Sequence, residues 1–470
     1  MADAVVVGAG PNGLSAAIRI AQAGRSVLVI EAAETIGGGT RTAELTLPGF
    51  SHDVCSAIHP MGVGSPFFRT LPLQSQGLEW IHPDLPLAHP LDDGRAATLA
   101  RSVDETAEAL GPDEEPYRKL FEPLVRNFRQ LARGVLAPLV RVPRHPLMAR
   151  MGLKGTQPAE RLARRSFGTE EGRALFAGLG GHSIRPLGAI LTAGPALFLG
   201  AAGHAYGWPM PRGGSQSIAD ALAGLLTELG GAIEMGREVK DFSELPPHEA
   251  VLFDTSPQTL ERIAASQLPG RFRARLRRFR HGPGVFKVDY ALDGPVPWTA
   301  TECRRAGTVH VGGTLEEITA AEAQVGRGQH PERPFVLVAQ PSLFDQTRAP
   351  EGKHVLWAYT HVPAGSTHDL TTAIESQIER FAPGFRDLVL ARAKKNAAEF
   401  ELYNANNVGG DISGGEMTLR QMLRRPKVFS PYTTPADGIY LCSASTPPGA
   451  GVHGMCGYWA AEAALKRELS

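Results

Sequence analysis

The first 31 residues contain the feature that most constrains the fold. An apolar run, Ala4–Val7, predicts a buried strand, and Gly8, Gly10 and Gly13 follow it with the spacing G-x-G-x-x-G. A helical pattern comes next, and a second apolar run then leads to Glu31. Strand, glycine loop, helix and strand in this order form a βαβ unit, which predicts a parallel sheet.

Each glycine of this unit has a mechanical reason. Gly8 lets the chain turn tightly out of the strand, Gly10 lets the backbone approach a pyrophosphate, and Gly13 lets helix and strand pack closely. The helix N-terminus then offers N–H groups and a positive dipole end to phosphates. Glu31 lies where a carboxylate accepts hydrogen bonds from a ribose 2′-OH and repels a 2′-phosphate. The unit therefore predicts a dinucleotide site that disfavours NADP.

Length, charge and cysteine content limit the other possibilities. At 470 residues the chain exceeds one ordinary hydrophobic core, so we expect two domains. Lys plus Arg and Asp plus Glu both number 48, so no net charge favours a nucleic-acid partner. The four cysteines form no C-x-x-C pair, which argues against a disulfide scaffold, a metal site or a redox-active dithiol. The first strand lies too close to Met1 for a signal peptide, so we expect a cytoplasmic location.

A second glycine-rich loop follows the βαβ unit. Gly37, Gly38 and Gly39 would let the backbone pass close to a pyrophosphate, and Arg41 and Thr42 can add charge and hydrogen bonds there.

Residues 64–204 depart from the α/β rhythm. A proline-rich loop is expected at Pro83–Pro90, followed by helical segments. Pro186–Gly203 carries no charge, and we interpret it as a buried helix beside a pocket, with a membrane-dipping surface as the alternative. Tyr117–Lys154 holds nine Arg or Lys against one acid. We interpret it as a solvated helical face, with peripheral contact to anionic lipid as the alternative.

The α/β pattern returns after residue 204. Ser217–Leu229 predicts a helix, and Ala232–Val239 and Ala250–Asp254 predict two more strands beside the nucleotide-binding unit.

Strand patterns of another kind follow. Val285–Leu292, Val336–Ala339 and His354–Thr360 predict an antiparallel sheet in a second domain, and Thr371–Phe381 predicts a helix.

The C-terminal end repeats the strand–loop–helix plan. Gly438–Cys442 is an apolar strand, a loop of small residues follows, and we expect a helix to begin near Val452. The N-terminus of that helix would point inward, with His453 in its first turn. In a flavoprotein of this plan such an end stabilises the negative charge of a reduced flavin.

Six segments spread over the whole chain resemble a known family. They are GAGPNGL (8–14) with Glu31, GGGTRT (37–42), GWPMPRGGSQSIADAL (207–222), FKVDYALDGPVPW (286–298), NNVGGDISGGEMTLRQ (406–421) and GIYLCSASTPPGAGVHGMCGYWAA (438–461). The sequence resembles the phytoene desaturase and carotenoid isomerase-like FAD oxidoreductases of the amine-oxidase-like superfamily. The nearest branch is the one named for pyridine nucleotide-disulphide oxidoreductase domain-containing protein 2.

The resemblance implies a fold and a cofactor. The fold class is α/β: a Rossmann-like FAD-binding domain made of residues 1–64, 205–270 and 425–470, and an α+β substrate domain, with antiparallel sheet and helical cap, made of 65–204 and 271–424. The implied FAD-binding residues are Gly8, Gly10, Pro11, Asn12, Gly13, Glu31, Ala32, Gly38, Gly39, Arg41, Thr42, Val239, Ala444, Gly451, Val452 and His453.

The resemblance also implies a reaction class. With one dinucleotide fingerprint, the organic substrate itself reduces the flavin, and oxygen, a quinone or another carrier reoxidises it. We expect hydride transfer from an apolar small molecule to flavin N5. The expected substrate pocket holds His59, His204, Tyr206 and Trp208, and the expected catalytic residues are His453, His59 and Tyr206. The alternatives are a redox-neutral isomerase that uses reduced FAD, an amine oxidase, and a flavin-binding scaffold without turnover.

Overall fold

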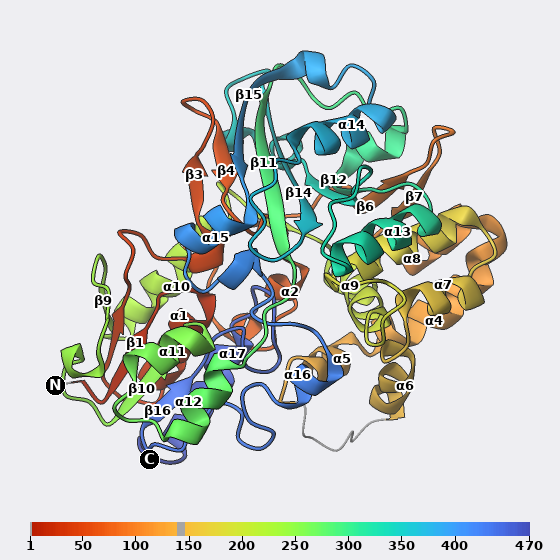
Figure 1. Cartoon of the computed structure of the whole chain (residues 1–470). Coiled ribbons are helices and arrows are strands. Elements are labelled where there is room, and N and C mark those ends of the chain that lie inside the picture. Colours follow the sequence, from red (N-terminus) through yellow and green to blue (C-terminus); the bar gives the residue numbers. More distant parts are fainter. Residues whose placement is uncertain (1, 139–145) are drawn as a thin grey trace.

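The computed structural model describes residues 2–138 and 146–470, and these form two β-sheets with helices packed around them (Figure 1). The first sheet has five strands, all parallel, in the order β16-β10-β1-β2-β9. Its strands are β1 (Ala4–Val7), β2 (Val27–Ile30), β9 (Ala232–Glu234), β10 (Ala250–Phe253) and β16 (Ile439–Leu441). The sheet thus joins strands from the two extremities of the chain.

Both faces of the parallel sheet are covered, which explains its continuous apolar strands. Ala4 and Val6 of β1 belong to the core cluster that contains one set of helices, and Val5 and Val7 belong to the cluster of the opposite face. The first set is α1 (Pro11–Ala21), α10 (Gln216–Glu228) and α17 (Met455–Leu465), and the second is α11 (Pro257–Ile263) and α12 (Gly270–Arg277).

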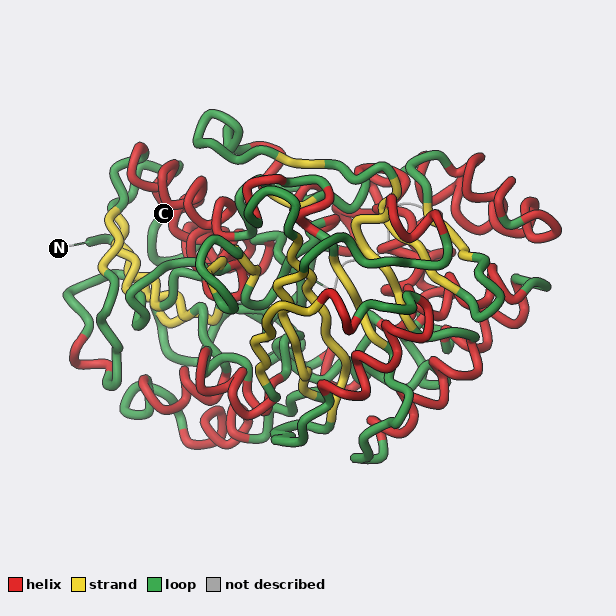
Figure 2. The backbone as a smooth tube through the Cα atoms, turned by 90° about the horizontal axis from the view of Figure 1, so that it is seen from above, coloured by secondary structure: helices red, strands yellow, loops and turns green. Residues whose placement is uncertain are grey.

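The second sheet has seven strands in the order β15-β11-β14-β13-β12-β6-β7. Its pairs are antiparallel except β12 with β6, which are parallel. The strands are β6 (Leu85–Pro90), β7 (Ala96–Leu99), β11 (Gly284–Leu292), β12 (Ala306–Val311), β13 (Val336–Ala339), β14 (His354–Val362) and β15 (Val389–Lys395). Seen from above, the two sheets lie side by side, and both chain ends lie at the parallel sheet (Figure 2).

Two short strand pairs and six further α-helices complete the described part of the fold. Short antiparallel pairs join β3 (Thr42–Glu44) to β4 (Ser51–Asp53) and β5 (Trp80–Ile81) to β8 (Met210–Pro211). The remaining α-helices outside the cap described below are α2 (Pro60–Val63), α3 (Val103–Ala109), α13 (Leu315–Gly326), α14 (Thr371–Phe381), α15 (Ala397–Tyr403) and α16 (Leu419–Leu423).

A cap of helices covers the end of the second sheet that carries β6 and β7. It consists of α4 (Glu114–Arg126), α5 (Phe128–Val135), α6 (Pro146–Gly155), α7 (Ala159–Ser166), α8 (Glu170–Gly181) and α9 (Ala193–Tyr206). The buried helix expected at Pro186–Gly203 is α9, which begins only at Ala193 because Leu191 has a left-handed φ of 77°. No described helix is both long and apolar enough to cross a membrane.

The basic segment Tyr117–Lys154 forms α4, α5 and α6, and its residues 139–145 lie outside the described residues. Helix α4 buries Tyr117, Phe121 and Leu124 on one face. Contact of the basic residues with anionic lipid stays a prediction, which sedimentation with vesicles at low salt would test.

Three local expectations were wrong. Pro83–Pro90 is not a loop, because β6 occupies most of it. The strand is held by backbone pairing with β12, which lies far away in the sequence and leaves no local signal. The strand expected at Ala232–Val239 ends at Glu234. Helix α17 begins at Met455 rather than near Val452, because Gly454 adopts a left-handed φ of 67° and interrupts the helix before it. His453 therefore precedes the helix.

Candidate functional site

One large cavity, of about 1600 Å³, runs between the two sheets. At one end it is lined by the β1–α1 loop, with Gly8 and Gly10, and at the other by residues of β12 and β14. Between them, the loop before α17 supplies another part of its wall. The carboxyl edge of the parallel sheet therefore opens into the same space as the second sheet, which is where α/β proteins place their ligands.

The glycine spacing produces a close approach of backbone segments. Gly8 has a φ of 104°, and a Cβ on Gly10 would lie 2.7 Å from the Asp254 carboxylate. A Cβ on Gly13 would lie 2.0 Å from the carbonyl oxygen of Gly8, so only glycine lets α1 pack against the end of β1. Gly8, Gly10, Pro11 and Asn12 line the cavity, whereas Gly13 does not.

Asp254 is a site residue that sequence reasoning missed. It follows β10, lines the cavity, and accepts the N–H of Gly13 on Oδ2 at 2.8 Å. Burial raises the pKa of this carboxyl from 3.8 to about 7, and the nearby Glu31 adds to the shift. Its position at the carboxyl edge of a strand beside β1 was the available signal, but the sequence alone does not show that β10 pairs with β1.

Glu31 lies at the end of β2, lines the cavity and is tied to the glycine loop. Its Oε2 accepts the N–H of Ala9 at 2.7 Å, and its Oε1 accepts the N–H of Ala33 at 3.0 Å and lies 3.3 Å from Arg41 Nη2. Ala32 is also on the wall. The carboxylate is thus fixed in the place where a ribose contact was predicted, and that contact itself stays a prediction.

The second glycine loop contributes Gly38, Gly39 and Arg41 to the wall. Thr42 is not on the wall: its hydroxyl donates to Asp53 Oδ1 at 2.8 Å and accepts the N–H of Gln216. Thr42 therefore holds the loop against the start of α10. Val239, expected on the adenine side, does line the cavity.

The loop before α17 brings Ala444, Gly451 and Val452 to the cavity. His453 is fully buried and is not part of the wall; its Nδ1 accepts the N–H of Met455 at 3.0 Å, and its carbonyl accepts the Ser65 hydroxyl. Burial lowers its pKa to about 4, so the ring is neutral at physiological pH. In this structure His453 shapes the loop rather than facing the cavity.

Arg425, beside this loop, was not foreseen. It lines the cavity, is 4% exposed, and donates to the carbonyl oxygens of Ala444 and Gly415. Nothing in its local sequence distinguishes it from neighbouring surface arginines.

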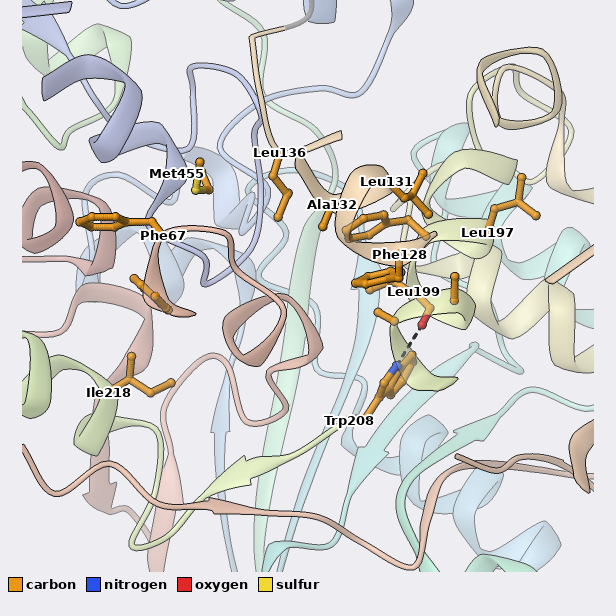
Figure 3. Packing of buried hydrophobic residues seen from close by; sticks show 14 of the residues in the cluster. Phe67, Phe128, Leu131, Ala132, Leu136, Leu197, Leu199, Trp208, Ile218 and Met455 are labelled. Atoms are coloured by element: carbon orange, nitrogen blue, oxygen red, sulfur yellow. Dashed lines mark hydrogen bonds between the residues drawn. The ribbon is translucent and has the colours of Figure 1, made fainter. Parts of the chain in front are cut away.

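Only two of the four expected substrate-pocket residues reach the cavity, namely His59 and Trp208. His59 Nε2 is 2.7 Å from the Ser215 hydroxyl, and burial lowers the pKa of His59 to about 4. Trp208 donates its indole N–H to the carbonyl of Leu199, as the dashed line in Figure 3 shows.

The other two expected pocket residues lie behind the wall. His204 Nε2 lies 2.6 Å from the Tyr117 hydroxyl, and burial lowers the pKa of His204 to about 4. Tyr206 packs under the Arg69 guanidinium, 4.4 Å from its ring centre. Tyr206 is not placed to touch a ligand in this cavity, and its expected catalytic role has no geometric support.

The end of the cavity at the second sheet is formed by residues that were not selected from the sequence. Trp357 and Tyr359 of β14, Thr308 of β12, Leu337 of β13 and His182 after α8 line it. Alternation along the strands was visible in the sequence, but which side faces the cavity depends on strand pairing.

Comparisons with known proteins agree with this arrangement. Residues 6–71 match the model of the NAD(P)-binding Rossmann-like domain family. The chain is 26% identical over 543 aligned positions, covering 97% of it, to "Pyridine nucleotide-disulfide oxidoreductase domain-containing protein 2" of Rattus norvegicus, of which 92% is covered. It is 24% identical over 437 positions to "Phytoene dehydrogenase" of Streptomyces griseus, with 83% of this chain and 78% of that protein covered.

Solved structures share the fold. An oxidoreductase from Methanosarcina mazei superposes with a TM-score of 0.64 at 17% identity, covering 99% of this chain and all of the other. Putrescine oxidase bound to putrescine gives 0.60 at 17% identity, with 99% of both chains covered. The predicted resemblance and the α/β fold class are thereby confirmed: the chain is similar along almost its whole length to the Rattus norvegicus protein and over parts of its length to phytoene desaturases, and it shares its fold with putrescine oxidase.

Proposed function

We propose that the chain is an FAD-dependent oxidoreductase that removes a hydride from an apolar small molecule. The observation that carries the proposal is the large cavity, because it connects the dinucleotide fingerprint with an aromatic and aliphatic chamber in the second sheet. A cofactor held at one end would face a substrate held at the other without a separating wall.

The residues present fit FAD. Gly10 and Gly38 leave backbone exposed to the cavity where a Cβ would crowd its neighbours, and Glu31 stands fixed at the end of β2. Asn12 Oδ1 is buried beside the cavity with no hydrogen-bond partner among the described residues, and so has bonding capacity for a ligand. We propose that these loops hold the nucleotide half, and that Ala444, Gly451 and Val452 border the flavin.

When bound, FAD supplies the acceptor for two electrons and a hydrogen at flavin N5. The chain's own contribution is positioning and exclusion of water by Trp208, Trp357 and Tyr359 around the substrate. The acceptor that reoxidises the cofactor, whether oxygen, a quinone or another carrier, stays a prediction, as do the catalytic roles expected for His59, Tyr206 and His453.

The direct test begins with FAD binding. We expect purified or reconstituted protein to show a flavin spectrum, and Glu31→Gln to raise the Kd for FAD at least tenfold, because the ribose loses a charged acceptor. Glu34→Gln is the matched control, since Glu34 is exposed in the same segment and is not on the cavity wall. Correctly folded protein that takes up no FAD would refute the proposal.

The second step separates the reaction classes. Under anaerobic conditions, bleaching of the flavin by an apolar compound, with an oxidised product, supports the proposed reaction. Conversion of the compound only after prior reduction of the flavin, without net oxidation, identifies the isomerase, and peroxide release with amines identifies the amine oxidase. A flavin that no compound reduces points to a scaffold. His59→Ala should slow reduction without loss of FAD.

A further inference from the structure

Apart from the Tyr359 hydroxyl and the Trp357 indole N–H, which donates to the Cys55 carbonyl, two polar side chains stand among the lining of the chamber at the second sheet, Thr308 and His182. We propose that these two side chains bind one uncharged oxygen function, a hydroxyl or carbonyl, on an otherwise apolar substrate. The inference rests on the proposed function, which it deepens by naming the substrate class: an oxygenated apolar molecule in place of a pure hydrocarbon or an amine.

Thr308 provides the first observation. It lies in β12, is 4% exposed and lines the cavity, yet its hydroxyl has no hydrogen-bond partner among the described residues. Buried hydroxyls in folded proteins are almost always paired, because an unpaired one loses its bonds to water without compensation. A ligand oxygen in the cavity would supply the missing partner.

His182 provides the second polar group, and its ring is held in place. It follows the last residue of α8 and is half-buried on the cavity wall. Its Nε2 lies 3.0 Å from Nε2 of the fully buried His310, so one ring donates a hydrogen to the other. Its edge packs on Trp208, with ring centres 5.5 Å apart and planes at 87°. His310 shares the strand of Thr308 and points to the same side, two residues away.

Thr308 and His182 are both uncharged, so they do not bind a charged ligand group by ionic attraction. Burial and the neighbouring His361 lower the pKa of His182 to about 3, so it is neutral at physiological pH. The acidic residues on the described cavity wall are Glu31, Glu238 and Asp254, all at the nucleotide end. Glu322, behind the chamber, is already bonded to His361 and is not on the wall. An ammonium group would find no counter-charge beside Thr308.

The test compares small probes on the FAD-loaded protein. Calorimetric titration with 1-octanol, octane, octylamine and octanoate measures the preference of the chamber independently of turnover. We expect the alcohol to bind at least tenfold more tightly than the alkane or either ion. Equal affinity for alcohol and alkane, or a preference for the amine, overturns the inference. Correctly folded protein that takes up no FAD but still prefers the alcohol refutes the proposed function and leaves this inference supported.

Thr308→Val identifies the hydroxyl without changing the shape of the side chain. We expect octanol to bind about tenfold more weakly, octane to bind unchanged, and the melting temperature to stay the same or rise, because an unpaired buried hydroxyl is removed. Thr319→Val is the matched control: its hydroxyl is also buried and unpartnered among the described residues, but it lies in α13 away from the cavity. An equal loss of octanol affinity in both variants overturns the inference.

His182 is tested by a pair of substitutions. His182→Leu should weaken octanol binding and leave octane unaffected, whereas His182→Asn, which keeps a hydrogen-bonding group, should retain part of the preference. A preference for octanol that survives in His182→Leu and Thr308→Val together shows that another part of the cavity binds the oxygen.

Discussion

At the scale of single residues, Asp254 has the most unusual environment of the nucleotide end. The carboxyl is buried under the glycine loop, accepts the N–H of Gly13, and stands close to a second acid, Glu31. Because its pKa is raised from 3.8 to about 7, the folded chain binds a proton more tightly than the unfolded chain. The stabilisation is therefore complete below pH 4 and disappears as the pH rises through 7.

Asp254→Asn should remove this dependence. The amide oxygen can still accept the Gly13 N–H, and no charge is buried, so the variant should be more stable than the wild type at pH 8 and similar to it at pH 4. The wild-type slope contributed by this group is at most roughly 1.4 kcal/mol per pH unit between pH 4 and 7. Urea unfolding of the FAD-free protein at several pH values measures it. Asp437→Asn, at an exposed position, should leave the slope unchanged.

Site residues within one short sequence segment could be predicted from the sequence, whereas those brought together by contacts between distant elements could not. Gly8, Gly10 and Glu31 belong to one short βαβ unit, so their common position follows from order alone. His182 comes beside β12, the strand of Thr308, through its contact with His310, and no local sequence pattern records that long-range contact. His453 was placed in a helix because the positive φ of Gly454 is not visible in the sequence.

At the scale of elements, the contact between α1 and α17 joins the two ends of the chain. A Cβ on Gly457 of α17 would lie 1.8 Å from the carbonyl oxygen of Asn12 and 3.0 Å from the amide nitrogen of Ala16. The two helices thus touch backbone to backbone, which only glycine permits.

Gly457→Ala should force the helices apart and lower the free energy of unfolding by about 3 kcal/mol. Gly152→Ala is the control: among the described residues, its own helix backbone and chain neighbours aside, no heavy atom lies within 4 Å of its Cβ position in α6. There the better helix propensity of alanine should stabilise by up to about 1 kcal/mol. Thermal melts of both variants decide it; a Gly457→Ala protein as stable as the wild type would contradict the close packing.

The apolar periodicity of the sequence predicted the bounds of several strands closely. β1, β2, β10, β11, β13 and β14 were found within two residues of their ends. β6 was mistaken for a loop because its prolines argue against a strand, yet they are tolerated between β12 and β7. The division of the chain into two domains at the stated boundaries stays a prediction, although each sheet draws on several separate segments.

At the scale of the whole molecule, a buried ion pair connects the segment between β13 and β14 with the β3–β4 hairpin. Arg348, in the segment between β13 and β14, donates from Nη2 to Asp53 Oδ2 at 2.9 Å and from Nε to the carbonyl of Ser51. The other oxygen of Asp53 accepts the Thr42 hydroxyl and the N–H of Ser215 at the start of α10. Both charged side chains are almost fully buried.

Arg348→Met should lower the free energy of unfolding by about 3–5 kcal/mol, because it leaves the Asp53 carboxylate buried without its counter-charge. Asp53→Asn combined with Arg348→Met should recover part of this loss, and a double-mutant cycle measures the coupling. Denaturant unfolding of the single and double variants checks it, and strictly additive losses would show that the two groups act independently.

The position of β16 has a consequence for biosynthesis. The loop that joins this strand to α17 brings residues 443–445 and 447–452 to the wall of the cavity, whereas the first part of that wall lies within residues 7–41. At a translation rate of about 5–20 residues per second, roughly 20–90 seconds pass between synthesis of the first part of that wall and synthesis of this loop. The nascent polypeptide cannot complete this wall before residue 452 has been synthesised, so a truncation ahead of the loop would remove part of the ligand site.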